Sequence, residues 1–226
     1  MPELTARQVA ERLGVTKRYA LDLLYNGEIS GRQLVNGVWL ADSDSVARYE
    51  IAGRRGSGRT LDASTGWALL WELSGRKAYW LSGSTRARVR RRLRESDVEA
   101  IATAVASRST AHRFTAANPE RAMSGLIRTG RAAADVVDSE LIEDHRWVCG
   151  YVRSGTVDEY AKSHFMIPKL TGNDVIYDNT LPVDYVDDVM PPAVVAADLA
   201  HSTDTRERSA GLRALERMRQ AWLAEN

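Results

Sequence analysis

The chain has 226 residues, of which 44% are hydrophobic and 27% are charged, an ordinary composition for a soluble protein of one large or two small domains. No apolar run approaches the roughly 18 residues needed to cross a bilayer, so we expect no membrane segment. The single cysteine excludes an internal disulfide framework and fits a reducing cytoplasm. Because there is no C-x-x-C pair and the four histidines are scattered, we expect no metal site, and we expect no cofactor.

Charge is divided unevenly along the chain. Residues 1–130 hold 21 Lys and Arg against 13 Asp and Glu, whereas residues 131–226 hold 10 against 17. A basic half suits a polyanion such as DNA, whose phosphates attract Lys and Arg. The acidic half suits a basic partner or the other half of the chain, although chance variation in surface charge also gives such a pattern.

The first predicted elements are two short helices. Thr5 and Gln8 form a capping box at the start of the first helix, with Leu4 placed to pack on Val9. Gly14 ends that helix. Thr16 caps the second helix, whose apolar stripe is Ala20, Leu21 and Leu24, and Asn26-Gly27 stops it.

A hairpin and a third helix are predicted next. Asn36-Gly37 between QLV and VWL is a strong hairpin signal, because both residues accept positive φ. We expect Leu34, Val38 and Leu40 on the buried face, with Trp39 beside it. Ser43, Asp44 or Asp42 can cap a third helix carrying Val46 and Tyr49.

This order of elements is that of a winged helix-turn-helix. It resembles the excisionase and MerR-like family of DNA-binding domains, from LTARQVAERLGVTKRYALDLLYNGEI through VNGVW to SDSVARY. The resemblance covers about residues 3–52, and we assign residues 1–52 to a DNA-binding domain. It implies double-stranded DNA as a partner, with operators that can be inverted repeats.

The predicted DNA contacts follow from the docking geometry of this motif, in which the start of the second helix enters the major groove. We expect Thr16, Lys17, Arg18 and Tyr19 to contact phosphates or base edges there. Arg7 and the wing residues Arg32 and Asn36 are expected on the DNA backbone. The alternative is a solvated charged face on a protein-interaction domain.

Residues 53–60 are basic and glycine-rich, and we interpret them as a linker. Arg54 and Arg55 of this linker can lie along phosphates, or can serve solubility only. Residues 61–226 would form a second domain that binds an effector or a partner.

A very basic helix, STRARVRRRLRES, follows in the second domain, with six arginines in residues 86–94. Val89 and Leu93 anchor the helix on one side. The arginines, among them Arg86 and Arg90, could form a second phosphate contact, a docking face for the acidic half, or a solvated surface.

The remainder of the second domain alternates helices and strands. Apolar helices are predicted over 63–73 and 97–106, a capped helix from Asn118 over NPERAMSGLIRTG, and a long final helix. Strands are predicted in 110–116, in 147–152 and on both sides of a turn at 171–174. The whole chain is therefore predicted to be mainly helical, of the α+β class.

No familiar catalytic motif is present, and we expect no enzyme. Asp144-His145 and His164 have no nucleophile placed with them. Asp184, Asp187 and Asp188 could hold a divalent metal as in a nuclease, but the further residues of a nuclease core are missing, and a solvated loop is the plainer interpretation. Cys149 in an apolar strand reads as inert packing.

Three stretches of the second domain, GLIRTGRAAADVVD, RWVCGYV and PPAVVAADLAHSTDTRERSAGLRALERM, resemble the C-terminal domain of AbiEi-type antitoxins. That resemblance implies a self-repressing partner of a nucleotidyltransferase toxin. The leading hypothesis is a sequence-specific transcriptional repressor of its own operon, acting as an antitoxin. The alternative is an excisionase-like architectural protein in site-specific recombination.

Overall fold

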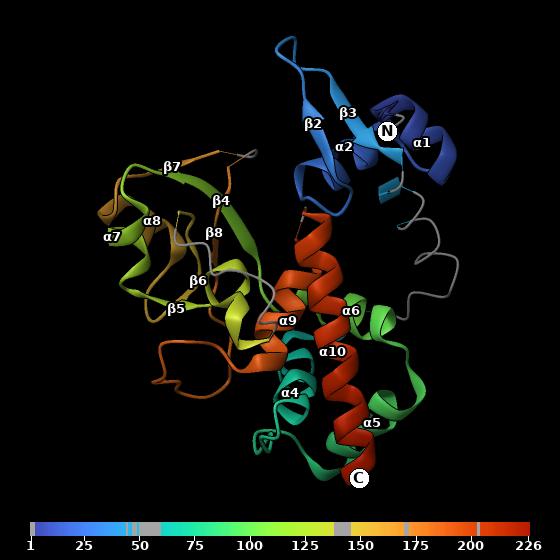
Figure 1. Ribbon diagram of the computed structural model, residues 1–226, viewed down its shortest axis with the longest axis vertical. Coiled ribbons are helices and arrows are strands. Elements are labelled where there is room, and N and C mark those ends of the chain that lie inside the picture. Colours follow the sequence, from blue (N-terminus) through green and yellow to red (C-terminus); the bar gives the residue numbers. More distant parts are fainter. Residues whose placement is uncertain are drawn as a thin grey trace.

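The computed structural model describes residues 3–43, 45–46, 49, 60–137, 146–169, 172–202 and 204–226. It is about 52% helical and 16% strand, so the predicted mixed α+β class is confirmed (Figure 1). In this described part, no helix is both long enough and apolar enough to pass through a membrane.

The N-terminal segment, meaning the described residues before 50, combines two helices with a three-stranded antiparallel sheet of order β1-β3-β2. Its elements are β1 (Glu3–Thr5), α1 (Ala6–Leu13), α2 (Lys17–Tyr25), β2 (Gly31–Gln33) and β3 (Trp39–Asp42). The predicted start and end of α1 are confirmed. Thr5 and Gln8 form a capping box, and Gly14 ends α1 in the left-handed region at φ 68°.

The predicted hairpin is present, but its buried face was wrong. Gly37 closes the turn at φ 82°, and the Leu34 amide donates to the Val38 carbonyl at 2.8 Å. Trp39 and Ala41 are buried, whereas Val38 is exposed and Leu40 is only half-buried. The Trp39 ring packs edge-on against Tyr25 at 5.2 Å. Side chains alternate along a strand, so choosing Val38 and Leu40 instead of Trp39 and Ala41 exchanged the two faces.

The helix signals after the hairpin are partly borne out. The Asp42 carboxylate accepts from the Ser45 amide at 3.1 Å, so Asp42, one of three proposed caps, makes a cap hydrogen bond.

The buried face of α2 differs from the prediction at one position. Its buried residues are Ala20, Leu23 and Leu24, with Leu23 in place of the predicted Leu21.

The C-terminal segment, meaning the described residues from 60 on, contains a five-stranded sheet and a helical layer. Its helices are α4 (Ala63–Leu73), α5 (Gly83–Glu95), α6 (Val98–Val105), α7 (Pro119–Met123), α8 (Val157–Ser163), α9 (Pro192–Ala200) and α10 (Thr205–Glu225). The 3-10 turns are η1 (Ala106–Arg108) and η2 (Gly130–Val136). The strands are β4 (Ala111–Ala116), β5 (Leu126–Arg128), β6 (Cys149–Val152), β7 (Met166–Pro168) and β8 (Asp174–Tyr177).

The sheet has the order β5-β6-β8-β4-β7, with β6 and β8 parallel and the other pairs antiparallel. Its two faces bury different clusters. Leu126 and Val152 pack with α7 and α8, while their neighbours Ile127 and Tyr151 pack toward α9. A strand covered on both faces has no polar side, which explains why the predicted strand at 147–152 is apolar throughout.

One expectation for this sheet was wrong. The helix predicted from Asn118 stops at Met123, and Leu126–Arg128 then pairs with β6 as the strand β5. Tertiary pairing overrides local preference there. The strands predicted on either side of 171–174 are present as β7 and β8, and β4 lies between them in the sheet.

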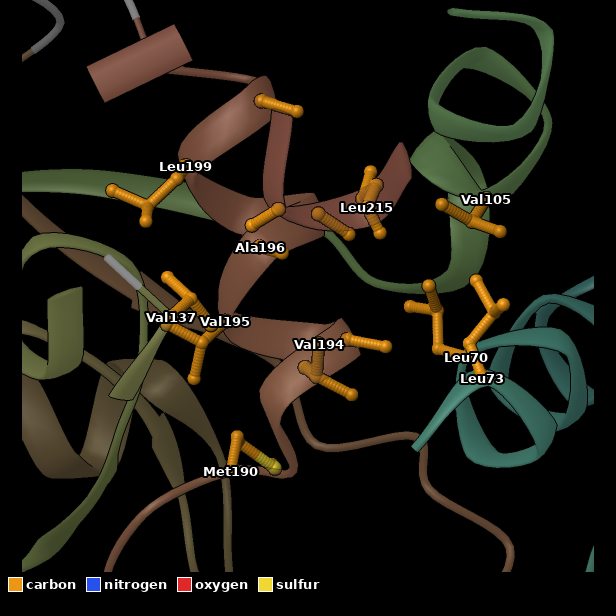
Figure 2. Close-up of a cluster of buried hydrophobic side chains, with 14 of the residues drawn as sticks. Leu70, Leu73, Val105, Val137, Met190, Val194, Val195, Ala196, Leu199 and Leu215 are labelled. Atoms are coloured by element: carbon orange, nitrogen blue, oxygen red, sulfur yellow. The ribbon is translucent and has the colours of Figure 1, made fainter. Parts of the chain in front are cut away.

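The centre of the main core is α9, in which every residue from Ala193 to Ala200 is buried. Val194 faces Leu70 and Leu73 of α4, while Val195 lies near Val137 on the opposite side (Figure 2). A helix that is apolar all round fits a position enclosed on every side.

Candidate nucleic-acid interface

The start of α2 presents the four predicted groove residues to solvent. The Thr16 hydroxyl accepts from the Tyr19 amide at 3.2 Å, so Thr16 caps the helix as predicted. Thr16, Lys17, Arg18 and Tyr19 are all exposed, and the next residue, Ala20, is fully buried. The buried stripe therefore fixes α2 and leaves its first turn outward.

Lys17 and Arg18 differ from the other basic side chains of the N-terminal segment. Neither forms a hydrogen bond or ion pair with any residue that the structure describes. By contrast, Arg7 pairs with Glu11 at 3.0 Å. Two cations at a helix N-terminus, with no partner among the described residues, are available to an anion outside the chain.

Tyr19 is held by a residue that the sequence did not single out for the site. Its hydroxyl lies 3.3 Å from the hydroxyl of Tyr49, which belongs to the predicted third helix. Burial, and then the hydrogen bond with Tyr19, raise the pKa of Tyr49, so its hydroxyl stays protonated near neutral pH. Tyr49 is thus a positioning residue for Tyr19, and only the folded contact reveals it.

The two predicted DNA contacts of the hairpin, Arg32 and Asn36, both form bonds within the protein. Arg32 makes a two-pronged ion pair with Glu3, at 2.7 and 2.9 Å, and this bond lowers the pKa of Glu3. The Asn36 side-chain oxygen accepts from the Val38 amide at 3.1 Å and so supports the turn. Val35, beside the turn, is fully exposed. A DNA contact by Arg32 would have to compete with Glu3.

The remaining predicted DNA contacts lie elsewhere. Arg54 and Arg55 are outside the described residues. In α5, Arg86 donates to the Ala78 and Leu81 carbonyls at 3.0 and 3.2 Å, and Arg90 pairs with buried Glu72 at 3.1 Å. These bonds favour a structural role for both side chains, joining α5 to α4 and to the loop between them.

Two aspartates of the cluster that could have held a metal, Asp187 and Asp188, form ion pairs with arginines. Asp187 lies 3.3 Å from Arg76, and Asp188 lies 2.5 Å from Arg153. Across the described residues no cluster of His, Cys, Asp and Glu suits a metal ion. His164 stacks on Tyr160 at 4.1 Å, and Asp144-His145 falls outside the described residues.

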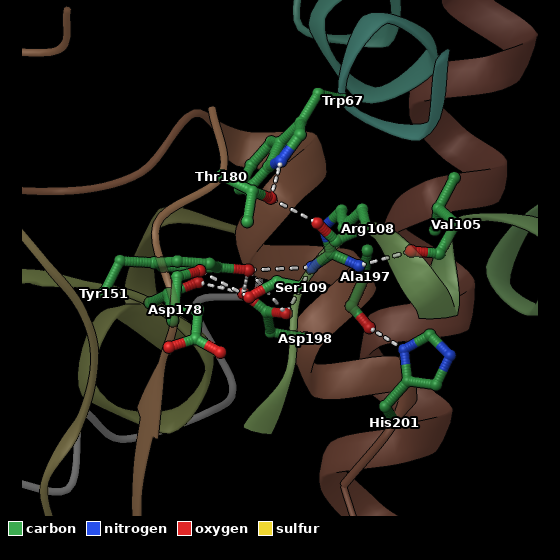
Figure 3. Close-up of polar contacts among 11 residues, drawn as sticks. Trp67, Val105, Arg108, Ser109, Tyr151, Asp178, Thr180, Ala197, Asp198 and His201 are labelled. Atoms are coloured by element: carbon green, nitrogen blue, oxygen red, sulfur yellow. Dashed lines mark hydrogen bonds and ion pairs between the residues drawn. The ribbon is translucent and has the colours of Figure 1, made fainter. Parts of the chain in front are cut away.

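A buried polar network joins the sheet to α9 (Figure 3). The Asp198 carboxylate accepts from Arg108, from the Thr129 hydroxyl at 2.6 Å and from the Tyr151 hydroxyl at 3.1 Å. Arg108 also donates to the Val105 carbonyl at 3.0 Å, and its guanidinium lies over the Trp67 ring at 5.4 Å. Burial raises the pKa of Tyr151 well above its ordinary value, so its hydroxyl stays protonated and can donate.

This network was missed by the sequence reasoning, although a signal existed. Asp198 is the one charged residue of PAVVAADLA, and a charge inside an apolar helix implies a buried partner. Both Arg108 and Asp198 are 3% exposed at their side chains. The network therefore links the sheet to α9 from within the core.

Chemical labelling of Cys149 can test whether solvent and reagents reach the buried region around Asp198. Cys149 is the only cysteine, it is buried, and burial followed by the nearby Asp198 charge raises its pKa to about 12. Below that pH the native thiol stays protonated, whereas a free cysteine has a pKa of about 8.5. We expect an aromatic disulfide reagent at about pH 8 to modify Cys149 in denaturant and hardly at all in the native protein. Complete labelling of the native protein within seconds would contradict this.

Comparisons of the chain with protein-family models, with curated proteins and with solved structures find no match.

Proposed function

We propose that the N-terminal segment is a winged helix-turn-helix that binds double-stranded DNA, and that the protein represses transcription of its own operon. The observation that carries the proposal is the exposed first turn of α2, with Lys17 and Arg18 unpartnered within the described part of the chain. In this docking mode α2 lies in the major groove and the β2–β3 hairpin lies beside it. Lys17 and Arg18 neutralise phosphates or read guanine edges, and Thr16 offers its hydroxyl to a phosphate.

Arg18→Ala is expected to weaken binding to the specific site by about 1–3 kcal/mol if the side chain reads a base. The measurement is a gel-shift titration on the promoter of the gene itself, at fixed salt. Arg121→Ala is the matched control, because Arg121 is an exposed arginine of α7 and its loss changes the net charge equally. Equal affinity of the Arg18 and Arg121 variants would contradict base reading by Arg18.

The same titration repeated over a salt series separates phosphate contacts from base contacts. A residue that contacts phosphate lowers the salt slope by about one when it is removed, and it weakens all sequences alike. We expect this behaviour for Lys17→Ala.

Footprinting on the promoter distinguishes a repressor, which protects one operator, from an architectural protein, which protects a phased array.

We further propose that the C-terminal segment binds a partner protein, a nucleotidyltransferase toxin. This part of the proposal rests on the resemblance of its sequence to antitoxins of that type. Co-expression with the adjacent gene tests it: the neighbour alone should arrest growth, and the full chain should restore it. A harmless neighbour, or arrest that this protein does not relieve, would contradict the antitoxin role and leave the repressor role standing.

A further inference from the structure

A groove of about 680 Å³ lies between α4, α5 and the start of α6. Its basic wall is one face of α5, where Arg88, Arg91 and Arg92 all line the opening. Leu61, Leu81 and Val89 supply apolar surface to the same groove. A volume of this size is within the range of small-molecule sites, which combine apolar walls with a few polar groups.

The three arginines are poorly satisfied by the protein itself. Arg92 is half-buried, and its Nε is buried without a hydrogen-bond partner. The rest of its guanidinium forms no hydrogen bond or ion pair with any described residue. Among the residues that the structure describes, Arg88 donates only to the Thr85 hydroxyl, at 3.0 Å, and Arg91 lies 3.9 Å from Glu95. Because Arg92 is only half-buried, the rest of its guanidinium remains open to an acceptor brought by a ligand, and a charged acceptor would bind it more strongly than a neutral one.

The groove also contains two carboxylates, and neither reaches Arg92. Asp62 caps α4 by accepting from the Thr65 amide at 3.0 Å, and Glu95 faces Arg91. Three guanidinium groups against two carboxylates leave a positive surplus where Arg88 and Arg92 meet the groove. Guanidinium forks match the oxygens of phosphate with paired hydrogen bonds.

We propose that this groove binds the phosphate group of a small molecule, with Arg88 and Arg92 as the main donors. The site is separate from α2 and does not depend on DNA binding. A ligand seated there contacts α4, α5 and α6 together, helices that otherwise meet through the main core.

Calorimetric titration of the full chain with inorganic phosphate, adenosine monophosphate and adenosine tests the site. Phosphate and the nucleotide should bind saturably, and adenosine should not. Arg92→Gln and Arg88→Gln should each weaken binding of the nucleotide about tenfold, the loss expected for one charge-assisted hydrogen bond. Arg94→Gln is the matched control, because Arg94 is an arginine of the same helix outside this groove and stacks on Trp222 at 5.6 Å.

Thermal unfolding of each variant is measured in parallel. If Arg92→Gln does not fold, the exposed Arg88 decides the test, because within the described part of the chain its replacement breaks only the Thr85 contact. The proposal is overturned if neither phosphate compound binds at about 1 mM, or if Arg94→Gln weakens binding as much as the groove variants do. It is also overturned if the groove variants weaken binding of duplex DNA and leave nucleotide binding unchanged, since the arginines would then serve the DNA backbone.

Discussion

Replacing Asp198 with alanine is expected to lower the free energy of unfolding by about 3–5 kcal/mol, the largest effect of any single change considered. The reason is the Arg108 guanidinium, which would remain buried with no carboxylate to balance its charge. Thr129 and Tyr151 would lose their acceptor as well. Urea unfolding followed by tryptophan fluorescence measures the loss, because Trp67 lies beside Arg108.

Two further variants separate the buried charge from a general effect of losing an aspartate. Asp188→Ala breaks an ion pair whose carboxylate is 85% exposed, and it should cost no more than about 1 kcal/mol. The double variant Arg108→Met with Asp198→Leu removes both charges and should recover part of the stability lost in Asp198→Ala. A loss for Asp198→Ala no greater than for Asp188→Ala would contradict the structural role of the network.

Gly211→Ala is expected to destabilise the protein by about 1–3 kcal/mol, although alanine is the better helix former by about 1 kcal/mol. Gly211 lies in α10 where it crosses α9, and an added Cβ would meet three backbone atoms of α9. These are the Ala200 nitrogen at 2.4 Å, the Ala196 oxygen at 2.5 Å and the Leu199 carbonyl carbon at 2.9 Å. Backbone atoms cannot rotate away, so the two helices would have to separate.

Gly83→Ala is the matched control for that substitution. Gly83 is the first residue of α5, and a Cβ added there meets nothing within 4 Å. Its replacement should leave the thermal midpoint unchanged or raise it slightly, since less chain entropy is lost on folding. A Gly211 variant as stable as the Gly83 variant would show that α9 and α10 are not packed this closely.

Local signals predicted the N-terminal segment well, because caps and turns depend on a few neighbouring residues. The capping box at Thr5, the left-handed Gly14, the cap at Thr16 and the turn at Gly37 are all present. The buried face of the hairpin was wrong because three neighbouring residues, Val38, Trp39 and Leu40, are all apolar. Only the packing of Trp39 on Tyr25 decides which side faces inward.

Longer-range features of the C-terminal segment were beyond local reasoning. The strand β5 follows α7 after two residues, and its pairing with β6 comes from a segment more than twenty positions away. The buried Asp198 was visible as an oddity in an apolar helix, yet its partner Arg108 lies 90 residues earlier. No spacing rule connects two such positions before the fold is known.

The part of the candidate interface that lies on the first turn of α2 was predictable from the sequence. Thr16, Lys17, Arg18 and Tyr19 lie together because they are consecutive, and their exposure follows from the buried stripe behind them. The pairing of Arg32 with Glu3 was not predictable, since it depends on β1, a strand absent from the sequence reasoning. The ion pair between Arg90 and Glu72 was not predictable either, because it depends on how α5 packs against α4.

We propose that the first turn of α2 reads DNA. The most direct test is selection from a library of random-sequence duplexes, with the full chain and with a Lys17→Ala/Arg18→Ala double variant whose folding is checked by circular dichroism. The full chain should enrich one sequence motif, bind it more weakly as salt rises, and lose that enrichment in the double variant. Equal enrichment by the double variant, or no motif enriched by the full chain, would contradict the claim.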